Sequence, residues 1–205
     1  MAVSCWYLWW IRRRHTHDEI VPPLYKCKLS ILAIAANSAM VLNRATTGGD
    51  PHWSRPPPRQ VKLNVDASFY DDLHAGATGA VVRDCQGNFI AAATTLLPNV
   101  VSVAMAEAWA MKEGLSFINS LGYSAIIAES DSLETVQACT GDETWWNESA
   151  AIFADCVTLV AEIGSVSFSF YPREANRVAH SLAKHCFSVK NSCNWVDKPP
   201  ISCTM

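Results

Sequence analysis

The sequence predicts an α/β fold, in which a mixed β-sheet carries helices on both of its faces. Two observations support this prediction. Three short segments with the composition of β-strands follow one another between residues 62 and 95, and helical and β-type patterns alternate after them. Sequential strands indicate a meander, whereas alternation indicates strands covered by helices. The predicted order of elements is therefore β-β-β-α-β-α-α-β-α.

The three strands of the meander come first. Residues Lys62–Phe69 alternate polar and apolar side chains, which is the two-residue period of a strand. Gly76–Arg83 and Asn88–Thr95 are two further β-rich runs, and Asp84–Gly87 between them has the composition of a turn. The first three strands follow from these features.

The alternating part begins with a helix over Val103–Leu121, where apolar residues recur at steps of three and four and Gly122 provides a stop signal. Ala125–Ala128 is a continuous apolar run, as expected for a buried central strand. The remaining predicted elements are a helix from Asp131 to Cys139, a helix over Ser149–Ile163, a strand over Val166–Phe170 and a helix from Glu174 to about Phe187.

Glycines and prolines divide the chain. Gly48, Gly49 and the run Pro56–Pro58 disfavour both helix and sheet and predict a linker. The predicted organisation is a partly helical N-terminal appendage over residues 1–46, a linker over 47–60, the main domain over 61–190 and a C-terminal tail without periodicity over 191–205.

Composition bears on location and on partners. The eight cysteines form no CxxC pair and follow no secretory signal, so we expect reduced thiols and an intracellular protein, in either nucleus or cytoplasm. No apolar run reaches the roughly 20 residues that span a bilayer. Residues 61–205 carry eight basic and sixteen acidic side chains. Because nucleic-acid-binding domains usually show a basic face, this balance argues against tight binding.

Three carboxylates occupy positions that need an explanation. Asp66 lies within a strand, where aspartate is depleted; the alternative is an exposed strand face or a bulge. Glu107 lies at the edge of the apolar stripe of the first helix; the alternative is an ordinary solvated glutamate. Asp131 follows the buried strand, and Asp131–Glu134 fits a variant of the capping box, so the alternative is an N-cap.

Taken together, these three residues have a common geometry. A central strand, the helix packed over it and the end of the adjacent strand can carry Asp66, Glu107 and Asp131 to one point. Clustered carboxylates repel one another unless a cation neutralises them, and Mg²⁺ prefers oxygen ligands. Two such ions about 4 Å apart activate a water and stabilise the leaving oxygen in phosphodiester hydrolysis. The set therefore predicts a magnesium site.

Four segments, taken in order, resemble one known family. Lys62–Phe69 resembles its first strand with the first catalytic aspartate, and Ala106–Ala110 resembles its helix with the catalytic glutamate. Glu129–Ser132 resembles the segment with the second catalytic aspartate, and Pro172–Lys184 resembles the last helix. The family is that of type-1 ribonuclease H domains, in the version attached to plant non-LTR retroelement reverse transcriptases. The resemblance covers about two-thirds of the chain.

The resemblance implies a ribonuclease H-like, five-stranded sheet of order 3-2-1-4-5, with strand 2 antiparallel to its neighbours. It implies metal-dependent endonucleolytic hydrolysis of the RNA strand of RNA–DNA hybrids by a retroelement-derived domain, with Mg²⁺ as cofactor and Mn²⁺ as a substitute. Catalysis is assigned to Asp66, Glu107, Asp131 and His180, of which the first three are also the metal ligands. Contact with nucleic acid is assigned to Ser68, Ser132, Arg173 and Asn176.

Two features depart from the family pattern and predict impaired catalysis. His180 stands where the fourth carboxylate would be, and imidazole is a poor ligand for Mg²⁺; the alternative for His180 is a histidine on the helix surface. Residues 104–106 are apolar, where cellular enzymes have polar residues that contact the hybrid. A domain that binds nucleic acid but cuts slowly or not at all is the alternative function, and a fold kept for protein interaction is a third. We expect a monomer without membrane contact or small-molecule cofactor.

Overall fold

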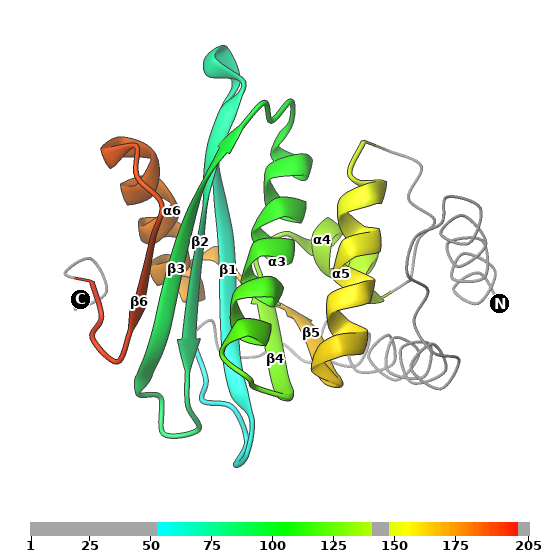
Figure 1. Ribbon diagram of the computed structural model, residues 1–205, viewed down its shortest axis with the longest axis vertical. Helices are drawn as coiled ribbons and strands as arrows, with labels where there is room; N and C mark the ends of the chain where they lie inside the picture. Colours follow the sequence, from blue (N-terminus) through cyan, green and yellow to red (C-terminus); the bar gives the residue numbers. More distant parts are fainter. Residues whose placement is uncertain (1–52, 141–147, 201–205) are drawn as a thin grey trace, which may run out of the picture.

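A six-stranded sheet runs through the molecule, with helices on both of its faces (Figure 1). The structure is a computed structural model that describes residues 53–140 and 148–200. The predicted N-terminal appendage therefore lies outside the described residues. The strands are β1 (Val61–Tyr70), β2 (Ala75–Arg83), β3 (Phe89–Pro98), β4 (Ala125–Ser130), β5 (Ser165–Phe170) and β6 (Cys193–Val196).

The sheet is mixed, as predicted, and its order is β5-β4-β1-β2-β3-β6. β2 is antiparallel to both β1 and β3, whereas β4 is parallel to β1 and to β5. The helices are α3 (Val103–Ser120), α4 (Leu133–Thr140), α5 (Ala150–Ile163) and α6 (Arg177–Val189). α3 and α5 cover one face and α6 covers the other. Within the described ranges, no helix is both long and apolar enough to cross a membrane.

The prediction of five strands is wrong, because β6 adds a sixth at the edge beyond β3. It lies in the segment predicted to be an unstructured tail, and it pairs antiparallel with residues Ala91–Thr94 of β3. Read from β3 to β5, the other five strands lie in the order 3-2-1-4-5. A strand of four residues contains too few alternations to show a period, so only its pairing with β3 reveals it.

Two glycines allow the helices to approach the sheet closely. A Cβ atom at Gly114 of α3 would lie 2.5 Å from Cγ1 of Val65 in β1. A Cβ atom at Gly79 of β2 would lie 2.2 Å from the carbonyl oxygen of Ala179 in α6. Because any larger side chain would push the helices outward, these glycines hold α3 and α6 at the depth from which they reach β1.

The chain in front of β1 is attached to the domain from Trp53 onward. The indole Nε1 of Trp53 donates a hydrogen bond of 2.9 Å to Oδ1 of Asn64, and Nζ of Lys62 donates one of 2.6 Å to the carbonyl oxygen of Ser54. The cations of Lys62 and Arg83 lie 5.2 and 4.9 Å from the centre of the Trp53 ring. The end of the predicted linker thus packs against β1 and β2.

Candidate metal and active site

Asp66, Glu107 and Asp131 meet at one point, and we call them the carboxylate trio. Each offers one oxygen atom, and these three atoms lie within 4.8 Å of one another. Asp66 comes from the middle of β1, Glu107 from the start of α3, and Asp131 from the residue after β4. The predicted convergence of the three side chains is confirmed.

The pairing of the strands explains where this point lies. β1 and β4 are hydrogen-bonded in parallel only as far as Asn64 and Glu129. Beyond them β1 continues, while the chain after β4 turns away into α4. The trio therefore gathers at the carboxyl end of a parallel strand, which is the position at which open α/β sheets commonly bind ligands.

Burial raises the free-energy cost of ionising the trio. Asp66 is 3% exposed and Glu107 is 9% exposed. Burial, followed by the charges of Glu107 and Asp131, raises the pKa of Asp66 to about 9. Burial and the charge of Asp131 raise the pKa of Glu107 to about 8. Near neutral pH the metal-free trio therefore keeps protons that a bound cation would displace.

The donor set fits a hard divalent cation. Among the described residues, Oε2 of Glu107 is buried and accepts no hydrogen bond. A buried oxygen without a partner costs free energy, and a metal ion would satisfy it. Because all three donors are carboxylates, Mg²⁺ and Mn²⁺ suit the site better than metals that prefer nitrogen or sulfur. Asp66, Glu107 and Asp131 would hold the ion.

His180 lies at the trio rather than on the outer surface of α6. Its Nδ1 is 2.6 Å from Oδ2 of Asp66, and its side chain is 20% exposed. Burial, followed by the charges of Arg173 and Lys184, lowers the pKa of His180. The pKa of Asp66 is raised and that of His180 is lowered, so burial opposes charge on both members of this pair when no metal is bound. The contact with Asp66 contradicts the alternative of an ordinary histidine on the helix surface.

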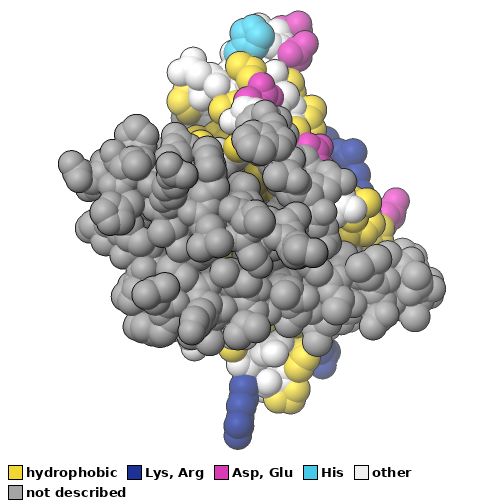
Figure 2. Space-filling model, turned by 90° about the vertical axis from the view of Figure 1, so that its right-hand side faces the viewer, with side chains coloured by type: hydrophobic (Ala, Val, Ile, Leu, Met, Phe, Trp, Pro, Cys, Tyr) yellow, Lys and Arg dark blue, Asp and Glu magenta, His cyan; other side chains and the backbone are white. Residues whose placement is uncertain are grey.

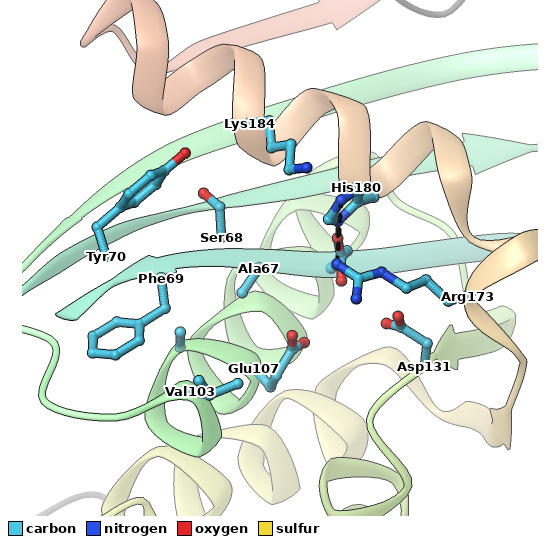
Figure 3. Close-up of a pocket in the computed structure, with 12 residues that line it drawn as sticks. Ala67, Ser68, Phe69, Tyr70, Val103, Glu107, Asp131, Arg173, His180 and Lys184 are labelled. Carbon is cyan, nitrogen blue, oxygen red and sulfur yellow. Dashed lines mark hydrogen bonds and ion pairs between the residues drawn. The ribbon is translucent and has the colours of Figure 1, made fainter.

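A groove of 390 Å³ opens from the trio along β1 as far as Tyr70 (Figure 3). Arg173, His180 and Lys184 line it on the side of α6, and Val103 lines it on the side of α3. Carboxylates thus sit at one end of the groove, with basic side chains beside them. Such an arrangement can bind a cation and a phosphate group next to each other.

The turn between β1 and β2 is acidic, whereas the groove also has basic side chains. Asp71, Asp72 and His74 lie in this turn. Figure 2 shows acidic side chains together with a histidine at one end of the molecule.

The residues predicted to contact nucleic acid take different places. Arg173 and Ser68 line the groove. Asn176 is buried and donates a hydrogen bond of 3.2 Å to Oδ1 of Asp131, which positions that carboxylate. Oγ of Ser132 accepts a hydrogen bond of 3.2 Å from the backbone nitrogen of Thr135 and so caps α4. This cap belongs to Ser132, so the alternative of Asp131 as the N-cap is wrong.

Sequence reasoning missed two polar residues of the groove. Lys184 follows His180 by four residues, so the helical repeat placed both on one face of the last helix and could have identified it. Tyr70 follows Asp66 by four residues on β1, so both point to the same face of the sheet. The ring of Tyr70 stacks on that of Phe187 in α6, with 3.7 Å between the centroids.

Comparisons with known proteins agree with this geometry. A family model described as reverse transcriptase-like matches residues 64–186. This range contains the whole trio and His180. No curated protein sequence matches the chain at a significant level.

The fold is that of ribonuclease H in solved structures. Ribonuclease H1 from Halobacterium salinarum has a TM-score of 0.60 and 19% identity, covering 63% of this chain and 98% of that one. The N-terminal ribonuclease H domain of a Mycobacterium tuberculosis protein has a TM-score of 0.59 and 18% identity, covering 63% and 94%. LC11 ribonuclease H1, solved in complex with an RNA/DNA hybrid, has a TM-score of 0.59 and 18% identity, covering 63% and 98%.

Proposed function

The chain belongs to the reverse transcriptase-like family and has the fold of ribonuclease H, and on this premise we propose that it hydrolyses the RNA strand of RNA–DNA hybrids with a divalent cation. The observation that carries the proposal is the trio itself, with ligand atoms within 4.8 Å at the end of a groove lined by Arg173 and Lys184. That LC11 ribonuclease H1 was solved with a hybrid supports the choice of substrate.

Each group of the site has a part in this reaction. Hydrolysis joins the hydroxyl of a water molecule to phosphorus, breaks the bond to the leaving ribose oxygen and delivers the other proton of the water to that oxygen. A divalent cation on the trio, Mg²⁺ or Mn²⁺ in our proposal, would lower the pKa of the attacking water and offset charge on the phosphate. Arg173 and Lys184 bind phosphate oxygens, Asn176 orients Asp131, and His180 orients Asp66.

We further propose that the domain descends from a retroelement of the plant non-LTR type. The support is the order of the four motifs in the sequence, ending with Pro172–Lys184. A domain that binds nucleic acid and cuts it slowly or not at all is the second candidate function. It is favoured by His180, which meets Asp66 at 2.6 Å in the place of a fourth carboxylate.

A hybrid-cleavage assay tests the proposal. The full-length protein should cut a labelled RNA–DNA hybrid in Mg²⁺ or Mn²⁺, and Glu107→Gln should reduce the rate at least a hundredfold, or about 2.7 kcal/mol of transition-state stabilisation. Glu113→Gln is the matched control, because Glu113 lies on the same helix and pairs with Lys112 outside the trio. Hybrid binding without cleavage in either metal would support the second candidate, and absence of both would refute the proposal.

A further inference from the structure

Arg173 enters the groove from the turn before α6, whereas Lys184 lies on α6 itself. In Figure 3 its guanidinium reaches in from the turn before α6 and lies between His180 and Asp131. Nη2 of Arg173 lies 3.3 Å from Nε2 of His180. Among the described residues, Arg173 forms no ion pair with a carboxylate. Its positive charge nevertheless lowers the pKa of Glu107, against the effect of burial. The guanidinium is thus close to the trio and free to meet an anion.

The surroundings of Asp66 disfavour a second metal ion. Oδ2 of Asp66 is occupied by Nδ1 of His180 at 2.6 Å, so it is not available as a bridging ligand without breaking this contact. On the side of Asp66 where His180 lies, the next groups are an imidazole and a guanidinium rather than oxygen donors, and Mg²⁺ and Mn²⁺ prefer oxygen. The positive charge of Arg173 also repels another cation at short distance.

We propose that this site binds one divalent ion on the trio, and that Arg173 takes the place of a second ion beside the phosphate that is cleaved. A guanidinium binds two non-bridging phosphate oxygens through parallel N–H donors. It offsets the negative charge that grows as the bond to the leaving oxygen breaks. The role assigned to Arg173 rests on the proposed function, because it requires a phosphodiester in the groove.

Binding of an uncleavable hybrid tests the phosphate contact without catalysis. The probe is a fluorescent RNA–DNA hybrid with 2′-O-methyl riboses, titrated with full-length protein at one salt concentration with EDTA. Arg173→Gln should weaken binding about tenfold, and Arg173→Lys should restore part of the loss. Arg177→Gln is the matched control, since it removes the same charge from an exposed position outside the groove. Equal effects of Arg173→Gln and Arg177→Gln would overturn the role of Arg173.

Electron paramagnetic resonance of Mn²⁺ tests the number of ions. Two Mn²⁺ ions about 4 Å apart couple magnetically, whereas one ion gives an isolated spectrum. The wild-type complex with the uncleavable hybrid should show an isolated ion, and the double variant Arg173→Gln/His180→Asp should show a coupled pair. A coupled pair in the wild type would overturn the single-ion site whatever the double variant does. If the wild-type protein binds no hybrid at all, the proposed function itself fails. If the wild type binds hybrid but Arg173→Gln and Arg177→Gln weaken binding equally, only the role of Arg173 fails.

Discussion

Two carboxylate sites border strands β1 and β4, and they differ in their counter-charges. Glu129 of β4 is fully buried, and its two oxygens meet Nζ of Lys62 at 2.6 Å and Nδ2 of Asn64 at 2.8 Å. Two positions further along β1 and just beyond the end of β4 lies the trio, which has no lysine or arginine within ion-pair distance among the described residues. Glu129 thus has a lysine of the same fold as its counter-charge, whereas the trio needs a cation from solution.

The difference separates a structural role from a functional one. A buried ion pair with matched hydrogen bonds changes little during any reaction, so the Lys62–Glu129 pair serves the attachment of strands β1 and β4. In the trio, burial and neighbouring carboxylates oppose ionisation and raise the pKa of Asp66 to about 9 and that of Glu107 to about 8. Perturbed carboxylates in a groove are typical of functional sites. Three changes can break or sharpen this comparison.

The largest effect on stability is expected for Lys62→Met. This change leaves Glu129 buried without its cation, and breaking a buried pair in this way costs about 3–5 kcal/mol. Urea unfolding of the full-length protein measures the loss. Lys112→Met is the matched control, because the Lys112–Glu113 pair is partly exposed and should contribute less than about 1 kcal/mol. Similar losses in the two variants would mean that Glu129 finds other compensation.

Asp66→Asn should raise the free energy of unfolding when metal is absent, whereas Lys62→Met lowers it. Asparagine removes a buried ionisable group while keeping a partner for His180, so we expect a gain on the order of 2 kcal/mol at pH 7 in EDTA. The exposed Asp71→Asn should change stability by less than about 0.5 kcal/mol. Denaturant unfolding measures both. A loss of stability in Asp66→Asn would show that the trio is not strained without its ion.

The smallest expected effect is the change in folding stability with pH and with Mg²⁺. Because the folded-state pKa values of Asp66 and Glu107 are raised, the folded protein holds more protons than the unfolded chain between about pH 4 and pH 8–9. Its metal-free stability should therefore fall as pH rises from 7 to 8.5, relative to Asp66→Asn/Glu107→Gln. Mg²⁺ at ten times its dissociation constant should add about 1.4 kcal/mol, and more at higher pH.

Thermal melts at several pH values, with and without Mg²⁺, measure this response. The double variant Asp66→Asn/Glu107→Gln serves as the reference because it retains every other titratable group of the protein. An equal shift with Mg²⁺ in the wild type and in the double variant would place the bound ions elsewhere.

The trio was predictable because its residues break local patterns. An aspartate in the middle of a strand and a glutamate beside an apolar stripe are both unusual at their positions, which marks them as candidates for a function. The strand and the helix that carry them were predicted from their hydrophobic periods. The Lys62–Glu129 pair was not predicted. Lys62 looks like an ordinary polar residue of an alternating strand, and Glu129 like the polar end of an apolar run. Only the parallel register of β1 and β4 buries them against each other.

By itself, the sequence determined the helices and the longer strands, the mixed sheet and the identity of the trio, because periodicity and residue type act over short stretches of chain. The tertiary structure alone decided the pairing of β6 with β3 and the contact of His180 with Asp66, which joins residues 114 positions apart. That contact depends on how deeply α6 lies on the sheet, which the close approach at Gly79 sets. Such a distance is a property of packing between elements, and no local pattern carries it.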